Sequence, residues 1–490
     1  MRDDLIAERM RKLAALRAAG VDPYPAQIKR SHTISELLDK FKSLEQDKKE
    51  VAVVGRVMGL RNQGGLLFAD LRDETGQVQI VAKRNEVADF ELLRDTLDLS
   101  DFLEVRGVPF TTQRGEQSVG ALSARIVVKS LRTLPSSWYG LQDVETRLRQ
   151  RYLDFLLNPD LKDLFAKKFK FWAEFRAFLT KAGFQEVEMP VLEPIPGGAE
   201  AEPFLTHHKA LDWDFYLRIS LELPLKKLLV AGFEKVFEIG RIFRNEGIDA
   251  EHLQDYTQLE FYWAYADYND LMKFVEKMYS SAIKNVFGTL TLPWNRKKID
   301  WTPPWPKVQY YDLFKKFTGL DLKTVTRDEL YMKALKENLK PELELGRGRL
   351  IDLLFKKMVR PTLVQPVFLV NPPVDIEPLA KRLSGNPDKV ARFQVVACQT
   401  ELGKGFSELN DPQDQRDRFT EQMDLRAKGD KEAQMLDEDF LVALEHGMPP
   451  AAGFGVSERL FSVLAGKPIR ELVFFPPMRP RDTNESGDRE

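Results

Sequence analysis

Arg244 and Glu246 are the strongest candidates for chemistry in this chain, because they lie in a segment, residues 236–265, with strand-like alternation. Residues two apart on a strand point to the same face, so the carboxylate of Glu246 could orient the guanidinium of Arg244. An arginine held in this way can grip a phosphate through two parallel hydrogen bonds. A solvated cross-strand pair has the same pattern. The pair therefore indicates phosphate binding only if other groups converge on it.

Short β-rich runs that begin at residue 51 predict a small barrel before this segment. Three runs lie between residues 51 and 83 and are separated by glycine-containing turns. A helical stretch at 86–99 follows, and then two further runs between residues 102 and 131. Five strands with a helix after the third are typical of an OB-type barrel.

A linker at Leu134-Pro135-Ser136-Ser137 predicts that a second domain of mixed α and β structure follows the barrel. Its first long helix is expected at about 160–182, with a strand at 185–190. The stretch 294–307 is rich in proline and tryptophan, which favours a loop or an insertion. Before the barrel, the apolar spacing in residues 1–19 predicts an amphipathic helix.

Composition indicates a folded chain of more than one domain. The 490 residues are 30% charged and 43% hydrophobic. The net charge is 73 − 75 = −2, so nucleic-acid binding would need a local basic face. The single cysteine, Cys398, excludes an internal disulfide and a cysteine-based zinc site. The acidic N-terminus and the lack of an apolar run of eighteen residues predict a soluble, cytoplasmic protein without a membrane segment.

Three segments resemble the three motifs of the class II aminoacyl-tRNA synthetases, in the same order. Phe243-Arg244-Asn245-Glu246 is similar to motif 2, whose core is a hydrophobic residue followed by Arg-x-Glu. GFQEVEMP at 183–190 resembles motif 1, whose proline lies at the dimer interface in that family. GFGVSERLF at 453–461 resembles motif 3, in which a glycine-rich strand leads into a helix that carries an arginine.

Longer stretches resemble the lysyl-tRNA synthetases within that class, and they span most of the chain. The resemblance implies a homodimer that binds ATP and Mg²⁺ and attaches L-lysine to tRNA(Lys). It also implies an α+β fold, with an OB-fold barrel before a catalytic domain built on an antiparallel sheet flanked by helices. The expected domains are a helical extension at 1–50, an OB-fold anticodon-binding domain at 51–135, a catalytic domain at 136–480 and a disordered tail at 481–490.

The resemblance further implies a lysine pocket made of six residues. Burying an ammonium costs free energy unless carboxylates and an aromatic wall replace its water. The expected set has Glu260 and Glu408 at the ε-ammonium, Tyr262 and Phe406 as walls of the slot, and Glu222 with the Gly198 backbone at the α-amino group. The two aromatic residues are equally compatible with ordinary core packing, but two acids within apolar strands would be costly without a cation.

An ATP site is implied in which no side chain acts as a nucleophile. Because the carboxylate of lysine is already ionised, catalysis would rest on alignment and on stabilising charge at the phosphates. Arg244 is expected at the α-phosphate and Arg459 at the γ-phosphate, and these are the predicted catalytic residues. The other expected ATP contacts are Glu246, His252, Tyr256 at the adenine ring, and Glu401, which is also the expected Mg²⁺ ligand. The alternative for His252 is an ordinary surface histidine.

Three positions depart from the family pattern. Gln394 stands where a second acidic metal ligand is common, which removes a negative charge; Glu408 is a further candidate ligand. Lys404 stands where the family usually has asparagine near the substrate, and its cation could contact an anionic group or repel lysine. Motif 3 has only Gly453 and Gly455 before its acid, and Ser457 is a candidate helix cap.

The predicted barrel carries the residues that single-stranded RNA recognition requires. The expected anticodon-binding residues are Arg61, Phe68 as a stacking ring, Gln79 and Glu116. Phe68 is equally compatible with a place in the barrel core. Basic residues of the N-terminal helix are candidates for backbone contacts, and a solvated charged face is the alternative: Arg2, Arg9, Arg11, Lys12 and Arg17.

Two alternatives to a lysine–tRNA ligase remain open at this stage. A divergent class II paralogue could use another amino acid or another acceptor, as the aspartyl and asparaginyl enzymes and the ligase that lysylates elongation factor P do. A non-catalytic RNA-binding protein could also have arisen from a decayed synthetase. Retention of Arg244, Glu246, Glu401 and Arg459 argues against decay, whereas Gln394 and the short motif 3 leave it possible.

Overall fold

The computed structural model describes residues 2–135, 141, 143–247, 252–430 and 433–480. The expected tail at 481–490 and the first residues after the linker, 136–140, lie outside the described residues. Contacts divide the chain into two compact units. One comprises Met1–Arg147 with Tyr152–Leu157, and the other comprises Leu148–Arg151 with Asn158–Glu490.

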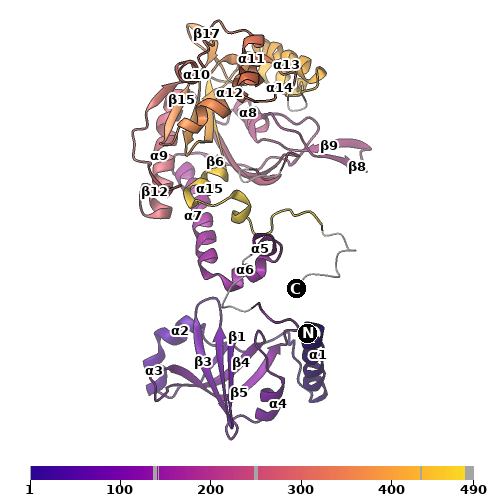
Figure 1. The fold of residues 1–490 in the computed structure, drawn as a ribbon, viewed down its shortest axis with the longest axis vertical. Helices are drawn as coiled ribbons and strands as arrows, with labels where there is room; N and C mark the ends of the chain where they lie inside the picture. Colours follow the sequence, from indigo (N-terminus) through magenta and orange to yellow (C-terminus); the bar gives the residue numbers. More distant parts are fainter. Residues whose placement is uncertain (1, 136–140, 142, 248–251, 431–432, 481–490) are drawn as a thin grey trace. The chain divides into compact units, whose positions relative to one another are not determined.

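The first unit is built around a closed five-stranded barrel (Figure 1). Its strand order is β1-β2-β3-β5-β4, in which only β3 and β5 pair in parallel. Along β2, Leu67, Ala69 and Leu71 face the core while the residues between them are partly exposed. The elements are α1 (Arg2–Ala18), α2 (Ile34–Asp39), α3 (Phe41–Gln46), β1 (Val51–Gln63), β2 (Leu66–Arg72), β3 (Gln77–Lys83), α4 (Phe90–Thr96), β4 (Phe102–Thr111) and β5 (Gln117–Val128). The predicted barrel, with its helix after the third strand, is confirmed.

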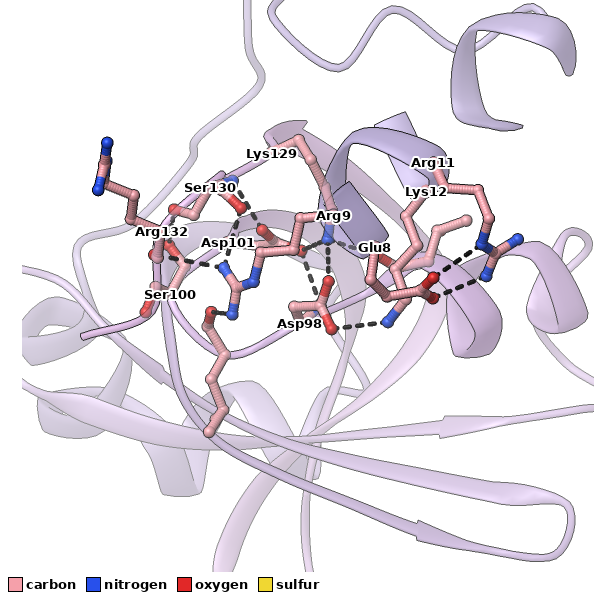
Figure 2. A network of polar contacts seen from close by, with 12 residues as sticks. Glu8, Arg9, Arg11, Lys12, Asp98, Ser100, Asp101, Lys129, Ser130 and Arg132 are labelled. Carbon is pink, nitrogen blue, oxygen red and sulfur yellow. Dashed lines mark hydrogen bonds and ion pairs between the residues drawn. The ribbon is translucent and has the colours of Figure 1, made fainter. Parts of the chain in front are cut away.

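Helix α1 is fixed to the barrel by polar contacts (Figure 2). The guanidinium of Arg9 donates to the carbonyls of Leu99 and Ser130, both at 2.9 Å. Lys12 forms an ion pair of 2.7 Å with Asp98, whose second oxygen contacts the buried Lys129 at 2.6 Å. The expectation that Arg9 and Lys12 are available to RNA is therefore wrong, because both donate to groups of the barrel.

The second unit is built on an eight-stranded sheet with the order β14-β15-β18-β19-β20-β11-β10-β6. The six central strands are antiparallel, and the two edge pairs are parallel. The strands are β6 (Gln185–Glu186), β10 (Lys235–Phe243), β11 (Asp255–Ala264), β14 (Lys307–Gln309), β15 (Val367–Val370), β18 (Arg392–Ala397), β19 (Thr400–Ser407) and β20 (Ala451–Ser457). The expected antiparallel sheet is confirmed, although the strand expected at 185–190 has only two residues.

Helices cover one face of this sheet and leave the other face for polar side chains. Phe171 of α7 and Leu271 of α9 share a core with Phe261 of β11 and Phe454 of β20. Because side chains alternate along a strand, the neighbours of Phe261 point to the opposite face. That face carries Glu260 and the other residues of the cavity described below.

Further elements complete the second unit and the segment that precedes it. The helices are α5 (Val144–Arg149), α6 (Arg151–Leu157), α7 (Pro159–Lys181), α8 (Glu222–Val230), α9 (Tyr268–Phe287), α10 (Tyr310–Thr318), α11 (Arg327–Lys336), α12 (Arg347–Leu354), α13 (Pro412–Ala427), α14 (Glu438–Glu445) and α15 (Arg459–Ala465). The small sheets are β7 (Leu192–Glu193) with β8 (Leu205–His208) and β9 (Trp213–Leu217), β12 (Thr291–Trp294) with β13 (Lys297–Asp300), and β16 (Arg382–Leu383) with β17 (Asn386–Val390). No helix in the described ranges is long and apolar enough to cross a membrane.

The prediction of a loop or an insertion at 294–307 is only partly correct. Residues 297–300 form the second strand of a hairpin, whereas residues 301–306 belong to no helix or strand. Strands β12 and β13 pair around Asn295 and Arg296, which both have positive φ, at 43° and 63°. Two such residues form the tight turn that matches the twist of a hairpin. Leu292 and Ile299 are buried in the main core, so packing stabilises the two strands.

Candidate active site

One cavity lies on the face of the large sheet that the core helices leave uncovered. Strands β11, β18, β19 and β20 form its floor, and residues of α12, α13 and the 198–200 loop add to its walls. Ten of the predicted site residues line it: Gly198, Glu222, Arg244, Tyr256, Glu260, Tyr262, Gln394, Glu401, Phe406 and Arg459. The fold thus brings together segments that are up to about 260 residues apart in the sequence.

An acidic group of Glu222, Lys226 and Glu408 adjoins the cavity. Of these three residues Glu222 lines the cavity, whereas the predicted lysine-binding residue Glu408 does not. The ammonium of Lys226 is 2.5 Å from Glu222 Oε1 and 2.5 Å from Glu408 Oε2. It also lies 5.4 Å from the centre of the Phe406 ring, within the range of a cation–π contact. Lys226 was not among the predicted residues. Its place four residues after Glu222 on α8 is the sequence pattern that could have indicated the pair.

Two carboxylates share one ammonium in this group, and burial disfavours the ionised form of both. Burial raises the pKa of Glu222 to about 7 and the pKa of Glu408 well above its ordinary value, although Lys226 acts in the opposite direction. Glu408 Oε1 is buried and accepts no hydrogen bond from the described residues. An acceptor of this kind is costly unless a donor arrives, which suits a cationic ligand.

Glu260 is held firmly by donors from its own chain. Its Oε1 accepts from Ser220 Oγ at 2.7 Å and from the Leu221 amide at 3.0 Å, and also from Gln258. Its Oε2 accepts from the Tyr262 hydroxyl at 2.9 Å. The carboxylate is therefore fixed in one orientation on the floor of the cavity, which favours a role in binding a donor at a defined point.

Glycines shape the floor beside these acids. A Cβ at Gly453 would overlap the Tyr262 ring and Glu408 Oε1. At Gly198, which has φ of +83°, a Cβ would lie 2.8 Å from the Cβ of Glu222. Both positions need glycine because the backbone approaches the acidic group closely.

A second charged group, with an excess of positive charge, joins Arg392 of β18 and Lys404 of β19 to Glu377, which lies outside both strands. Glu377 Oε2 is 3.1 Å from Arg392 Nε and 3.3 Å from Lys404 Nζ. Burial would raise the pKa of Glu377, but Lys404 and Arg392 hold it below its ordinary value. Lys404 lines the cavity, so this departure from the family pattern brings a cation to the site.

The predicted ATP residues Arg244, Tyr256 and Arg459 lie together at another part of the same cavity. The Arg244 guanidinium is 5.8 Å from the centre of the Tyr256 ring and donates to the Ile219 carbonyl at 3.2 Å. The buried Arg459 Nε has no hydrogen-bond partner in the described part of the chain. Arginine N–H groups near the Tyr256 ring suit a nucleotide, because its phosphates accept hydrogen bonds and its base can stack on the ring.

The expectation that Arg244 and Glu246 share a strand face is wrong. Strand β10 ends at Phe243, and the Arg244 amide makes a last ladder-like bond of 2.7 Å to the Gln254 carbonyl. The next amide, of Asn245, turns away and donates to the carbonyl of Glu202. Neither Glu246 nor His252 is among the residues that line the cavity, and both lie beside the undescribed residues 248–251.

Motif 3 joins strand β20 to helix α15 at Glu458. Glu458 holds the N-cap position of this helix but makes no capping hydrogen bond with its side chain. The Oγ of Ser457, the predicted cap, accepts from the Arg459 amide at 3.3 Å. Glu458 accepts from the Thr257 amide at 3.2 Å and lies 3.2 Å from the ammonium of Lys168 on α7. Glu458 therefore ties the start of α15, and with it Arg459, to β11 and α7.

Gln394 of β18 and Glu401 of β19 are the predicted metal residues. They are not paired in the strand register, but their side chains are in contact. Gln394 Nε2 donates a hydrogen bond to Glu401 Oε2. No group of three or more His, Cys, Asp or Glu side chains that could hold a metal ion occurs among the residues that the structure describes. Glu408 lies with Lys226 rather than with this pair.

Three of the predicted anticodon residues, Arg61, Phe68 and Gln79, share one outer face of the barrel. Phe68 is half-buried between the core-facing Leu67 and Ala69, so it points outward rather than into the core. The Arg61 guanidinium lies 5.8 Å from the centre of its ring. Gln79 accepts from Ser118 Oγ at 3.1 Å, and Glu116 is exposed in the turn before β5.

Comparisons with known proteins agree with this arrangement. Residues 143–479 match the family described as tRNA synthetases class II (D, K and N), and residues 51–134 match the family of OB-fold nucleic acid binding domains. A lysine–tRNA ligase of Moorella thermoacetica is 45% identical over 98% of this chain and 99% of its own length. Those of Carboxydothermus hydrogenoformans and Roseiflexus sp. are each 44% identical over the same shares. The chain therefore belongs to the class II tRNA synthetases of the D, K and N group, and it carries their OB-fold domain.

Proposed function

We propose that this chain is an ATP-dependent lysine–tRNA ligase, which forms lysyl-adenylate and transfers lysine to the 3′ end of tRNA(Lys). The observation that carries the proposal is the pairing, within one cavity, of an acidic, aromatic-walled end with an arginine-rich end. The acidic end suits the two ammonium groups of lysine, and the arginines suit a triphosphate. Full-length relatives with the name lysine–tRNA ligase support the same activity.

The reaction needs positioned charges rather than a nucleophilic side chain. The lysine carboxylate attacks the α-phosphorus of ATP, which releases pyrophosphate and leaves lysyl-adenylate; the terminal ribose hydroxyl of the tRNA then displaces AMP. Arg244 would hold the α-phosphate and Arg459 the γ-phosphate, with Tyr256 against the adenine ring. Charge that develops at the phosphates is then stabilised by groups that are already in place.

Magnesium would be held mainly by the phosphates of ATP. Mg²⁺ prefers oxygen ligands and is commonly bound through one or two carboxylates together with substrate phosphates. Glu401 supplies one carboxylate, and the Gln394 amide can turn its oxygen toward an ion, so the residues present fit this minimal role. When bound, the ion would neutralise charge on the leaving pyrophosphate.

tRNA binding is assigned to the outer face of the barrel that carries Phe68. A half-buried ring with the Arg61 cation above it suits stacking on an unpaired base, and Gln79 presents an amide to a base edge. Glu116 lies in the adjoining turn. The match to OB-fold nucleic acid binding domains supports this assignment.

A homodimer is part of the proposal. The small sheet of β7, β8 and β9 exposes large apolar side chains on one face, among them Leu192 of β7 at 43% and Trp213 of β9 at 62% exposure. Exposed apolar groups of this size on neighbouring strands are typical of a surface that another protein covers. A second copy of the chain is the partner that the family resemblance implies.

The first experiment is ATP–pyrophosphate exchange with each of the twenty amino acids, with Mg²⁺ and without tRNA. Exchange that depends on lysine alone, followed by lysylation of tRNA(Lys), is the expected result. Exchange with a different amino acid would identify a divergent paralogue instead. No exchange with any amino acid, together with tRNA binding, would identify a non-catalytic RNA-binding protein.

A further inference from the structure

Two groups of opposite charge lie at the same cavity. The first reaches the cavity through Glu222, and all three residues of the second line it. The first, which we call the acidic trio, is Glu222, Lys226 and Glu408, with two carboxylates and one ammonium. The second, the basic trio, is Arg392, Glu377 and Lys404, with two cations and one carboxylate. With every group ionised, the formal charge is −1 for the acidic trio and +1 for the basic trio. Glu260 adds a further carboxylate to the acidic side.

Lys404 and Glu260 lie on opposite sides of a glycine in one row across the sheet. Lys404 of β19 is paired with Gly455 of β20, and Gly455 is paired with Glu260 of β11. Two strand spacings separate the outer residues, which is about 10 Å between their Cα atoms. Because Gly455 has no side chain, the space above it is bounded by a cation on one side and a carboxylate on the other.

The ammonium of Lys404 is not saturated by its own chain. An ammonium has three donors, and the described residues give it one acceptor, Glu377 Oε2 at 3.3 Å. The same oxygen also lies 3.1 Å from Arg392, so a single carboxylate is divided between two cations. Burial would lower the pKa of Lys404, but Glu377 raises it above its ordinary value, so the cation persists at neutral pH.

We propose that Lys404 binds the ionised α-carboxylate of the amino-acid substrate and thereby selects substrates that carry this charge. The inference rests on the proposed function and adds to it a specificity-determining contact that depends on a residue of this chain. The ammonium groups of the substrate would lie toward Glu260 and the acidic trio, and its carboxylate toward the basic trio. Glu377 and Arg392 are then positioning residues, because they fix the location of the Lys404 ammonium.

The test compares L-lysine with L-lysinamide, in which the carboxylate is replaced by a neutral amide. Binding of each ligand to the full chain is measured by titration calorimetry without ATP, for the wild type and for Lys404→Gln. The wild type should bind lysine at least about tenfold more tightly than lysinamide, because a charge-assisted hydrogen bond is lost. Lys404→Gln should reduce this ratio to about threefold or less, mainly through weaker lysine binding.

Two further variants separate this role from effects on folding. Lys404→Arg keeps the charge and should retain most of the discrimination against lysinamide. Lys356→Gln is the matched control, since Lys356 lines the same cavity and is paired with Asp352 at 2.7 Å. Its ratio of lysine to lysinamide affinity should equal that of the wild type.

Several outcomes would overturn the inference. The first is a ratio of lysine to lysinamide affinity that is the same in Lys404→Gln as in the wild type, including the case in which both affinities fall by the same factor. The second is a rise in the KM for ATP without a change in this ratio, which would indicate that Lys404 contacts a phosphate instead. If the wild type binds an amino acid other than lysine, the proposed function fails, and the same comparison between that amino acid and its amide still decides the role of Lys404. Binding of no amino acid would refute both.

Discussion

The ammonium of Lys226 and the carboxylate of Glu408 lie 2.5 Å apart, although one comes from helix α8 and the other follows strand β19. Both side chains are buried, at 0% and 1% exposure. Their contact joins two segments that are distant in the sequence, and Lys226 also contacts Glu222, which lines the cavity. The ion pair is therefore part of the core as well as part of the site.

Replacing Lys226 by Met should destabilise the protein by about 3–5 kcal/mol, because two buried carboxylates would lose the cation they share. Chemical denaturation of the variant at neutral pH measures this difference. Lys227→Met is the matched control. Lys227 is paired with Asp439 at the surface, and its loss should cost less than about 1 kcal/mol. Equal effects of the two substitutions would contradict a structural role for the buried pair.

Glu260→Gln should raise the KM for lysine about tenfold or more and leave the KM for ATP nearly unchanged. The amide would remove a negative charge and would also direct an N–H group at one of the donors that the carboxylate now satisfies. Exchange kinetics with each substrate varied in turn measure the two constants. Glu234→Gln is the control, because Glu234 is exposed and lies just before strand β10. This substitution should change neither the KM for lysine nor the KM for ATP. A normal KM for lysine in Glu260→Gln would remove Glu260 from the pocket.

Glu193→Gln should make the protein more stable at alkaline pH. Burial raises the pKa of Glu193 to about 8, even though Arg218 acts to lower it, and its Oε2 accepts no hydrogen bond from the described residues. A raised carboxyl pKa gives a contribution to stability that is complete below the unfolded value of about 4.5 and is lost as the pH rises through about 8. The neutral amide avoids this loss. The difference in Tm between variant and wild type should therefore grow from pH 5 to pH 8 and then level off.

A pH-independent difference in Tm would show instead that Glu193 acts through packing alone. Glu188→Gln provides the comparison, because Glu188 is an exposed carboxylate five residues earlier in the same segment. That substitution should leave the difference in Tm near zero across the same pH range.

Phe68→Ala should weaken aminoacylation without affecting amino-acid activation. Stacking of one base on an aromatic ring contributes about 1–3 kcal/mol, so kcat/KM for tRNA should fall by roughly 5- to 150-fold. ATP–pyrophosphate exchange takes place in the other unit and should be unchanged. Phe110→Ala, on β4 of the same barrel, is the control for a general loss of barrel stability. A normal kcat/KM for tRNA in Phe68→Ala would exclude stacking at this ring.

Patterns that lie within single segments were sufficient to predict the barrel and the first long helix of the second unit, whereas the large antiparallel sheet was expected from the family resemblance. The barrel strands alternate between core and surface, as Leu67, Phe68 and Ala69 do, and this alternation is visible without any knowledge of their partners. The main helix of the second unit, α7, could be placed to within one residue at each end from its apolar spacing. The cavity residues of β11, β19 and β20 were expected from the resemblance to the lysyl-tRNA synthetases, which could be seen because the matching segments are contiguous in the sequence.

Features that depend on contacts between distant segments could not be predicted. Nothing near Lys226 in the sequence shows that Glu408 will meet it, and nothing near Arg9 shows that the Ser130 carbonyl will accept its hydrogen bond. The β12–β13 hairpin was missed for a local reason. Its turn residues, Asn295 and Arg296, include an arginine with positive φ, a conformation for which glycine is the usual choice.

The polar contacts of helix α1 define where the smallest independently folding RNA-binding fragment would have to begin. Lys129 is fully buried, and the carboxylate of Asp98 lies between its ammonium and that of Lys12 on α1. A fragment that starts at β1, as the sequence match to the OB-fold family would suggest, would leave Asp98 with one cation and would expose the surface under Leu13 and Leu16. A fragment that contains the isolated barrel should therefore include helix α1, which begins at residue 2, and should not start at residue 51.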